Sequence, residues 1–162
     1  MTCSLAVHGA AILQILNHEI VNSTALYDVQ PRHPDSMADW FASREVHACP
    51  TLGLESDQGE LLGFASYAPF RPHAAYSHTM EHSIYVHPNH RNQGLGRQLL
   101  HALVAHAEQQ SVHVLIGVID ATNAASIALH KALGFRHVGT LPEVGFKFGR
   151  WLDVCLYQRL LG

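Results

Sequence analysis

The chain has 162 residues, of which 48% are hydrophobic and only 14% are charged, and its formal net charge is −3. This length and apolar content fit one domain, residues 1–162, with a substantial core, and they exclude a disordered or coiled-coil chain. The slightly acidic balance, without any run of Lys or Arg, argues against nucleic acid as the main ligand.

The N-terminal segment lacks the features of an export signal or a membrane anchor. No Lys or Arg precedes Arg32, whereas a secretory signal needs a positive start. The apolar stretch at residues 10–16 is far too short to cross a bilayer, so we expect no membrane contact. Cys3, Cys49 and Cys155 show no paired spacing, which favours reduced thiols and a cytoplasmic protein.

The first part of the chain is predicted to contain a short strand and two helices. A strand at residues 2–7 is followed almost at once by residues 9–22, whose apolar side chains recur at helical spacing. Residues 35–46 form the second predicted helix, and Asp35 is a suitable residue to cap its N-terminus.

Three strands are predicted next. Residues 50–56 and 61–69 are strand-like and are separated by a turn, and a further strand covers residues 79–87 after a loop. Alternation along this third strand puts Ile84 and Val86 on the same face.

The second half of the chain predicts a strand-helix-strand crossover unit. An amphipathic helix begins near Leu95, and residues 112–119 are almost continuously apolar, which suits a strand of a parallel sheet that is covered on both sides. A further helix covers residues 123–133 and ends before Gly134, and residues 135–160 are predicted to form two more strands.

A glycine-containing segment between a strand and a helix predicts a phosphate site. Its residues are Arg91, Asn92, Gln93, Gly94, Leu95 and Gly96. Helix N-termini carry unpaired N–H groups and a partial positive charge, glycines let the backbone approach an anion, and Arg91 and Arg97 add charge. A P-loop needs Gly-Lys-Ser/Thr at its end, and the dinucleotide fingerprint needs Gly or Ala at Leu99, so neither pattern is met.

The remaining pattern, (Q/R)-x-x-G-x-(G/A), resembles the acetyl-CoA pyrophosphate loop of the GNAT superfamily of N-acetyltransferases. The segment from Asn123 to Phe135 resembles that family's N-x-x-S/A…G-F helix. Four other segments are similar to the phosphinothricin and methionine sulfoximine acetyltransferase branch, and they are residues 22–25, 40–44, 81–86 and 144–154. The resemblance covers residues 12–160.

The resemblance implies an α/β (α+β) fold: a mixed, mostly antiparallel twisted sheet with a parallel, splayed central strand pair, flanked by about four helices. It implies acetyl-CoA as co-substrate, no required metal, and a homodimer. The implied reaction is direct attack, in a ternary complex, by a small amino-acid-like amine resembling methionine sulfoximine, methionine sulfone or phosphinothricin. Two alternatives stay open: another amine, such as a different amino acid, a polyamine or a protein N-terminus, or a non-catalytic acyl-CoA-binding module.

The implied cofactor contacts fall on three segments. The backbone of Ile84, Tyr85 and Val86 is expected to pair with the pantetheine amides, and a backbone N–H there to serve as the oxyanion donor. The glycine loop, with Arg97, is expected to hold the pyrophosphate. Asn123 and Ser126 are expected beside the pantetheine arm, although Asn123 also suits the N-cap of its helix.

Glu81 and His130 are the two candidates for proton transfer. Glu81 lies early on the strand at residues 79–87 and faces away from Ile84 and Val86. In the family this stretch supplies the general base. His130 shares one polar helix stripe with Asn123 and Ser126, at a position where the family carries a group that faces the thioester sulfur.

The amine substrate is expected to carry a carboxylate and therefore to need a cation. Arg71, in the loop before the third strand, is the best candidate because guanidinium binds carboxylate through two hydrogen bonds. Lys147 is a further cation, and Tyr27 and Tyr76 are candidates for the pocket wall. The chain has Ser77 where relatives carry an Arg, which weakens the sulfoximine and phosphinothricin assignment.

The 14 histidines raise the question of a metal site. The chain has no H-E-x-x-H, no C-x-x-C and no Cys/His finger pattern. His101 and His106 are five residues apart on a predicted helix and so point to different faces. His82, His87 and His90 run from a strand end into a loop, and nothing in the sequence brings them together. We therefore expect no specific metal site.

Overall fold

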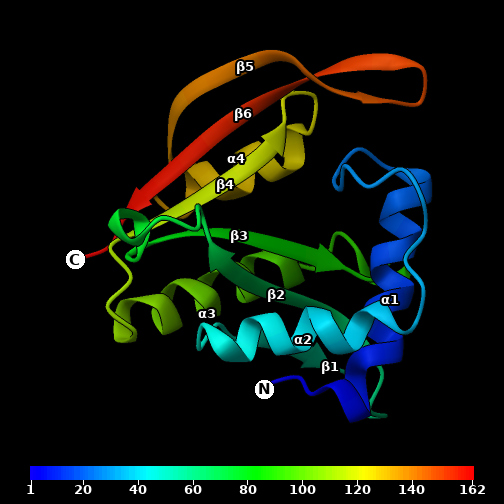
Figure 1. Cartoon of the computed structure of the whole chain (residues 1–162). Coiled ribbons are helices and arrows are strands. Elements are labelled where there is room, and N and C mark those ends of the chain that lie inside the picture. The colour runs from blue at the N-terminus through cyan, green and yellow to red at the C-terminus, as the bar shows by residue number, and fades with distance from the viewer.

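A six-stranded mixed sheet runs through the molecule in the order β1-β2-β3-β4-β6-β5 in the computed structural model, which describes all residues 1–162 (Figure 1). The strands are Thr51–Glu55 (β1), Leu61–Pro69 (β2), Thr79–Val86 (β3), Val114–Asp120 (β4), Arg136–Lys147 (β5) and Arg150–Leu160 (β6). Only β3 and β4 pair in parallel, and every other neighbouring pair is antiparallel. The predicted mixed, mostly antiparallel sheet with a parallel central pair is confirmed.

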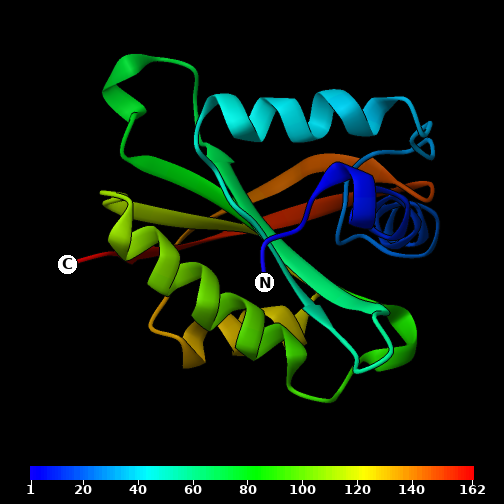
Figure 2. The same ribbon diagram turned by 90° about the horizontal axis from the view of Figure 1, so that it is seen from below.

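Four α-helices cover the sheet, two on each face (Figure 2). They are Leu5–Asn22 (α1), Ser36–Val46 (α2), Leu95–Gln109 (α3) and Ala124–Ala132 (α4), and two 3₁₀ turns, Ala74–Tyr76 (η1) and Pro88–His90 (η2), flank β3. One apolar core lies under α1 and α2 around Ile12, Phe41 and Phe64. The other lies under α3, where Leu99 and Leu103 are fully buried against the sheet. None of the helices combines the length and apolar character that crossing a bilayer requires.

The parallel pair β3–β4 separates part-way along its length. Pairing runs from Thr79 opposite Val114 to His82 opposite Gly117, whereas β3 continues to Val86 and β4 to Asp120. Beyond this point the two strands diverge (Figure 1). Backbone groups of β3 that face the gap have lost their strand partner, so a ligand placed there can replace it.

The chain begins differently from the prediction. The strand expected at residues 2–7 is wrong, because α1 already begins at Leu5 and only a single bridge, Thr2 to Leu52, joins this segment to the sheet. The helix extends this far because the His8 ring accepts a 3.0 Å hydrogen bond from the backbone N–H of Ser4 and so caps the first turn. Asp35 precedes α2 as predicted, but its side chain makes no capping bond.

Candidate functional site

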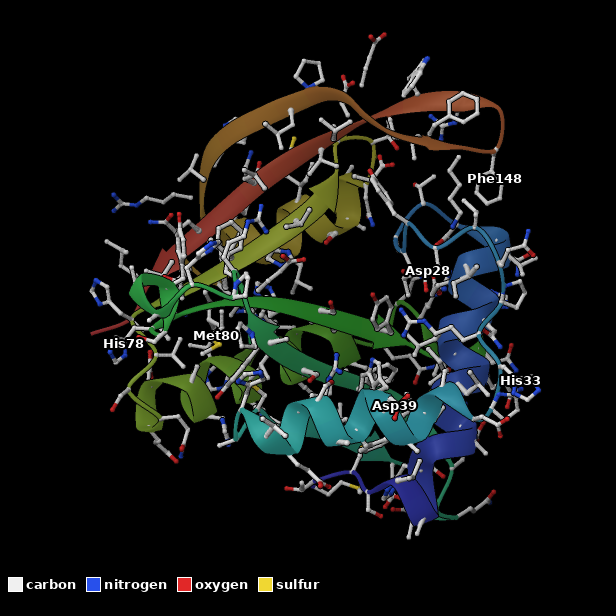
Figure 3. All side chains as sticks on the ribbon, viewed as in Figure 1. Asp28, His33, Asp39, His78, Met80 and Phe148 are labelled. Atoms are coloured by element: carbon white, nitrogen blue, oxygen red, sulfur yellow. The ribbon has the colours of Figure 1, made fainter.

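A cavity of about 710 Å³ fills the opening between the diverging strands. Its walls come from α1 and the α1–α2 loop, from both β3 and β4, from the segment at residues 90–96, from α4 and from the β5–β6 turn. Phe148, in that turn, lies on the same side of the molecule as Asp28 in the α1–α2 loop (Figure 3). The cavity is therefore built by segments from both ends of the chain around the splayed strands.

The glycine loop forms one end of this cavity. Gly94 precedes α3 with φ of 76°, a left-handed conformation that glycine adopts without steric cost. The first N–H groups of α3 have no intrahelical partner, and they lie at the cavity where Leu95 and Gly96 line it. Arg91 and Asn92 also line the cavity, whereas Gln93 and Arg97 do not. This end can bind a phosphate group through backbone N–H groups and the positive end of the helix dipole.

Glu19 of α1 holds the loop in place and was missed from the sequence. Its carboxylate pairs with the guanidinium of Arg91 and accepts a 2.5 Å hydrogen bond from the hydroxyl of Ser23. Glu19 is only 5% exposed although it lines the cavity. The pair joins residues 72 positions apart, which no local pattern reveals. It orients Arg91 and offsets part of its charge.

The N-terminus of α4 faces the cavity from the other side. The Asn123 side chain accepts a 3.1 Å hydrogen bond from the backbone N–H of Ser126, so its N-cap role is confirmed. Asn123, Ser126 and His130 all line the cavity, as the shared helix stripe predicted. Gly134 follows the helix with φ of 82°, the left-handed conformation expected of a residue that ends a helix.

His130 is paired with a second buried histidine, His82 of β3. The two Nε2 atoms are 2.9 Å apart, and His130 Nδ1 lies 2.7 Å from the backbone carbonyl of Ser126. That carbonyl only accepts, so Nδ1 of His130 carries the proton and its Nε2 accepts from the Nε2–H of His82. Both rings are 5% exposed, and Nδ1 of His82 has no partner. Both nitrogens of His130 are thus engaged within the protein.

The two imidazoles are neutral at pH 7. Burial lowers the pKa of His130, and the hydrogen bond to the Ser126 carbonyl opposes this only in part. Burial and then the neighbouring His130 lower the pKa of His82 to about 3, against the opposing effect of the Ile116 carbonyl. His82 was missed because its partner is 48 residues away.

Glu81 lies on the other face of β3, outside the lining of the cavity. It is partly buried, and burial raises the pKa of its carboxyl group while the nearby Arg71 opposes that shift. The Arg71 guanidinium packs 4.3 Å from the centre of the Phe70 ring, and Tyr76 packs against the same ring at 6.0 Å. Arg71 and Tyr76 are exposed and do not line the cavity either. Together these side chains form a polar group beside the base of the splay.

Lys147 does not present a free cation to the cavity. Its ammonium donates to the backbone carbonyls of Ser23 and Leu26, at 2.8 and 2.6 Å, and the residue is 4% exposed. The expectation that it binds substrate is therefore replaced by a role in holding the α1–α2 loop. Tyr27 packs directly on Gly145, where an added Cβ would lie 2.6 Å from the ring. Tyr27 supports this wall but does not line the cavity.

Asp120 is a further polar residue that the sequence did not single out. It ends β4, lines the cavity and is 4% exposed. Its Oδ1 accepts from the backbone N–H and the hydroxyl of Thr122, at 2.7 and 2.5 Å, whereas Oδ2 has no partner. The sequence could have indicated this residue, because Asp120 lies at the carboxyl end of a predicted parallel strand, where α/β proteins bind ligands.

Comparison with known proteins identifies the family. The family described as "Acetyltransferase (GNAT) family" matches residues 14–135, which include the glycine loop and α4. This chain belongs to the GNAT acetyltransferases. The L-methionine sulfoximine/L-methionine sulfone acetyltransferase of Pseudomonas aeruginosa is 42% identical over 162 residues, which cover 98% of this chain and 94% of that protein. The phosphinothricin N-acetyltransferase of Alcaligenes faecalis is 41% identical over 152 residues, or 93% and 77% of the two chains.

A solved GNAT structure shares the whole fold. The phosphinothricin acetyltransferase of Sinorhizobium meliloti, in complex with acetyl-CoA, superposes with a TM-score of 0.96 at 34% identity and covers 100% of this chain and 87% of its own. The resemblance noted in the sequence, to the GNAT superfamily and to its phosphinothricin and methionine sulfoximine branch, is confirmed.

Proposed function

We propose that this GNAT enzyme transfers the acetyl group of acetyl-CoA to the amino group of a small amino-acid-like substrate of the methionine sulfoximine, methionine sulfone or phosphinothricin type. The observation that carries the proposal is the cavity between the splayed strands, which has a phosphate-binding helix end on one side and a wall from the α1–α2 loop and the β5–β6 turn on the other. The names of the two relatives support this class of acceptor.

Acetyl-CoA fits the cavity in one direction. Its pyrophosphate binds at the N-terminus of α3 beside Arg91, and its pantetheine arm runs along the free edge of β3 at residues 83–86, past Asn123. The thioester then lies at the base of the splay, near Gly117. Backbone N–H groups of β3 that have lost their strand partner are suited to stabilise the oxyanion.

Glu81 is the proposed general base. The acceptor ammonium gives a proton to Glu81, and the free amine attacks the thioester carbonyl to form a tetrahedral intermediate. The intermediate collapses to the amide as the C–S bond breaks, the nitrogen loses its second proton, and the thiolate takes up one proton. Burial raises the pKa of Glu81 toward the range that suits this role. His130 is neutral with both nitrogens engaged, so we assign it to positioning Ser126 and the base of the splay.

Arg71 is the proposed partner of the acceptor's carboxylate, with Tyr76 beside it. Arg71 lies close enough to Glu81 to oppose the rise in its pKa, which supports a cation near the proposed base. Ser77 supplies no second cation. This observation favours the alternative of another amine, such as a different amino acid.

The acceptor is tested by thiol release from acetyl-CoA with a panel of amines: methionine sulfoximine, methionine sulfone, phosphinothricin, common amino acids, spermidine and a peptide. Preferred turnover of the first three supports the proposal. Turnover of only the other amines refutes this acceptor class and keeps the transferase. Bound acetyl-CoA without turnover of any amine would point to a binding module.

The roles of the two proton-transfer candidates are separated by pH profiles. We expect Glu81→Gln to lower kcat by about 10²- to 10⁴-fold and to remove the acidic limb of kcat/KM. We expect His130→Asn to lose less activity and keep that limb. The opposite pattern, in which only His130→Asn removes the acidic limb, would contradict the assignment of the base to Glu81.

We also propose a homodimer formed through the β5–β6 hairpin, in the cytoplasm. Six large apolar side chains of the hairpin are 44–60% exposed: Val138, Leu141, Val144, Phe146, Phe148 and Trp151. Such a patch favours a protein partner, and Phe148 also lines the cavity. Trp151→Arg is expected to yield a monomer in light scattering, and an unchanged mass would exclude this interface.

The three buried free cysteines support a reducing compartment.

A further inference from the structure

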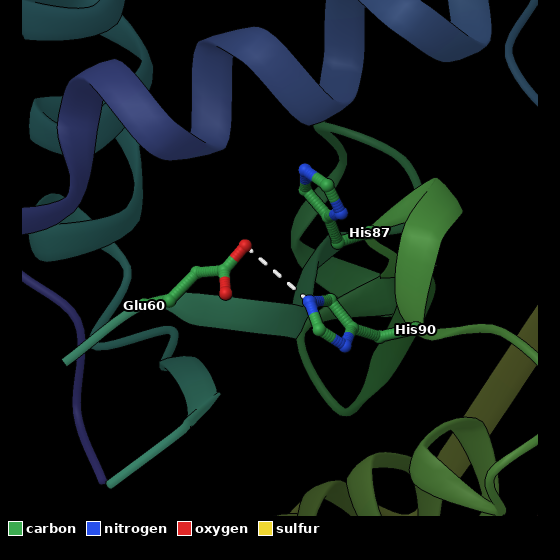
Figure 4. A group of neighbouring side chains, drawn as sticks. All are labelled: Glu60, His87 and His90. Atoms are coloured by element: carbon green, nitrogen blue, oxygen red, sulfur yellow. Dashed lines mark ion pairs between the residues drawn. The ribbon is translucent and has the colours of Figure 1, made fainter. Parts of the chain in front are cut away.

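Three side chains that commonly ligate metals meet on the surface beside the glycine loop. Glu60 comes from the turn between β1 and β2, and His87 and His90 flank and end η2 (Figure 4). One ligand atom from each residue lies within 4.8 Å of the others, and His90 Nε2 is 3.3 Å from Glu60 Oε1. Sequence spacing gave no reason to expect this, because Glu60 is distant along the chain. We call these residues the Glu60 cluster.

The backbone brings the cluster together. A 3₁₀ turn has three residues per turn, so side chains three positions apart, such as those of His87 and His90, lie on one side of it. The backbone N–H of His90 donates to the His87 carbonyl at 2.9 Å, which closes that turn. The backbone N–H of His87 donates to the carbonyl of Leu62 at 2.8 Å, which fixes η2 against the start of β2, two residues after Glu60. The convergence is therefore built into the fold.

Two imidazoles and one carboxylate suit a divalent ion that is borderline between hard and soft, such as Zn²⁺. In a tetrahedral site with bonds of about 2.0–2.1 Å, neighbouring ligand atoms are about 3.3 Å apart. The 3.3 Å separation of His90 Nε2 and Glu60 Oε1 already has this value. An ion there would replace the direct contact between these two side chains.

His87 needs the larger adjustment. Its Nδ1 accepts a long, 3.3 Å hydrogen bond from the backbone N–H of Asn89, so the ring is only weakly held in its present orientation. The side chain is only partly buried, so the fold does not enclose the ring. Water can fill the fourth position.

We propose that Glu60, His87 and His90 bind one divalent transition-metal ion, with Zn²⁺ as the fitting case. The acetyl transfer proposed above does not require this ion. His90 and Arg91 both line the cavity, so the ion would add positive charge close to the phosphate end. We therefore expect bound Zn²⁺ to lower, not raise, the KM for acetyl-CoA.

The test uses the tag-free protein after chelator treatment and dialysis. Zn²⁺ is titrated calorimetrically, and Co²⁺ is titrated while its visible absorption is followed, since that absorption reports tetrahedral coordination. We expect one ion per chain. Glu60→Gln and His87→Ala are each expected to weaken binding at least about tenfold. Glu60 is exposed and His87 is only partly buried, and circular dichroism is used to check that the variants are folded.

The matched control is His33→Ala. His33 forms another exposed pair with a carboxylate, Asp35, at 3.1 Å, but it has no third ligand. We expect this variant to bind Zn²⁺ like the unmodified chain. Equal weakening by His33→Ala, or unchanged binding in Glu60→Gln and His87→Ala, would show an adventitious ion only and overturn the proposal.

Discussion

Gly117→Ala offers a sharp test of how tightly the base of the splay is packed. A Cβ at Gly117 would lie 3.0 Å from His130 Nε2, 3.1 Å from His130 Cδ2 and 3.2 Å from His82 Cε1. Comfortable contacts between such atoms are about 3.5–4.0 Å, so both rings must move by several tenths of an ångström. Phe135 packs against both rings with centroids at 5.1 Å, so they cannot simply retreat.

The expected cost follows from this geometry. Overpacking of this kind destabilises by about 1–3 kcal/mol, which lowers Tm by about 2–4 °C per kcal/mol in a chain of this size. The 2.9 Å hydrogen bond between the rings is stretched, so the base of the splay loses its fixed arrangement. If the transition state loses about 1–2 kcal/mol of stabilisation, kcat falls about 5- to 30-fold. The KM for acetyl-CoA should change little, because the phosphate end of the cavity is remote.

The assay combines thermal unfolding with steady-state thiol release. Gly139→Ala, in β5, is the matched control, because an added Cβ there meets nothing within 4 Å. The control is expected to keep Tm and kcat. If Gly117→Ala behaved like Gly139→Ala in both measurements, the inferred packing of the histidine pair would be refuted.

Three further predictions follow from the same structure. Arg91→Ala is expected to raise the KM for acetyl-CoA and to destabilise the fold by about 1–3 kcal/mol in urea unfolding, because Glu19 loses its partner; unchanged values of both would contradict the pairing. Asn123→Ala removes the cap of α4 and is expected to lower the free energy of unfolding by about 0.5–2 kcal/mol. An unchanged free energy of unfolding would show that the cap does not stabilise the fold. Burial lowers the pKa values of His82 and His130, so below the ordinary histidine pKa of about 6.5 the unfolded chain binds more protons than the folded chain. The free energy of unfolding should therefore fall as the pH drops from about 6.5 toward about 3. Urea unfolding of His130→Asn should show a shallower fall over the same range.

The sequence predicted the features that depend on neighbours along the chain. The glycine loop, the cap at Asn123 and the alternation of β3 are local, since each is set by residues within one helix turn or one strand. The parallel pairing of β3 with β4 followed from the strand-helix-strand order. These elements place the cofactor side of the cavity, which is why the family could be identified from the residues alone.

The features of the site that the sequence did not predict depend on contacts between residues far apart in the chain. Glu19 meets Arg91 across 72 positions and His82 meets His130 across 48, and no spacing rule links them. Lys147 was interpreted as a cation for substrate because a lysine in a sequence carries no sign of its partner. Its partners are backbone carbonyls more than 120 residues away, at Ser23 and Leu26. The strand expected at residues 2–7 was wrong for a different, local reason, since the ring of His8 caps the first turn of α1 by accepting from Ser4, four residues earlier.

The bonds made by Lys147 have a consequence for how acceptor preference can diverge. They join the β5–β6 hairpin to the α1–α2 loop through main-chain carbonyls, so the tether does not depend on the identity of the loop's side chains. Substitutions at Thr24 and Ala25, which line the cavity between the two anchored carbonyls, therefore leave this tether in place. Natural drift or directed evolution can re-shape this wall one side chain at a time, while the cofactor end of the cavity stays intact.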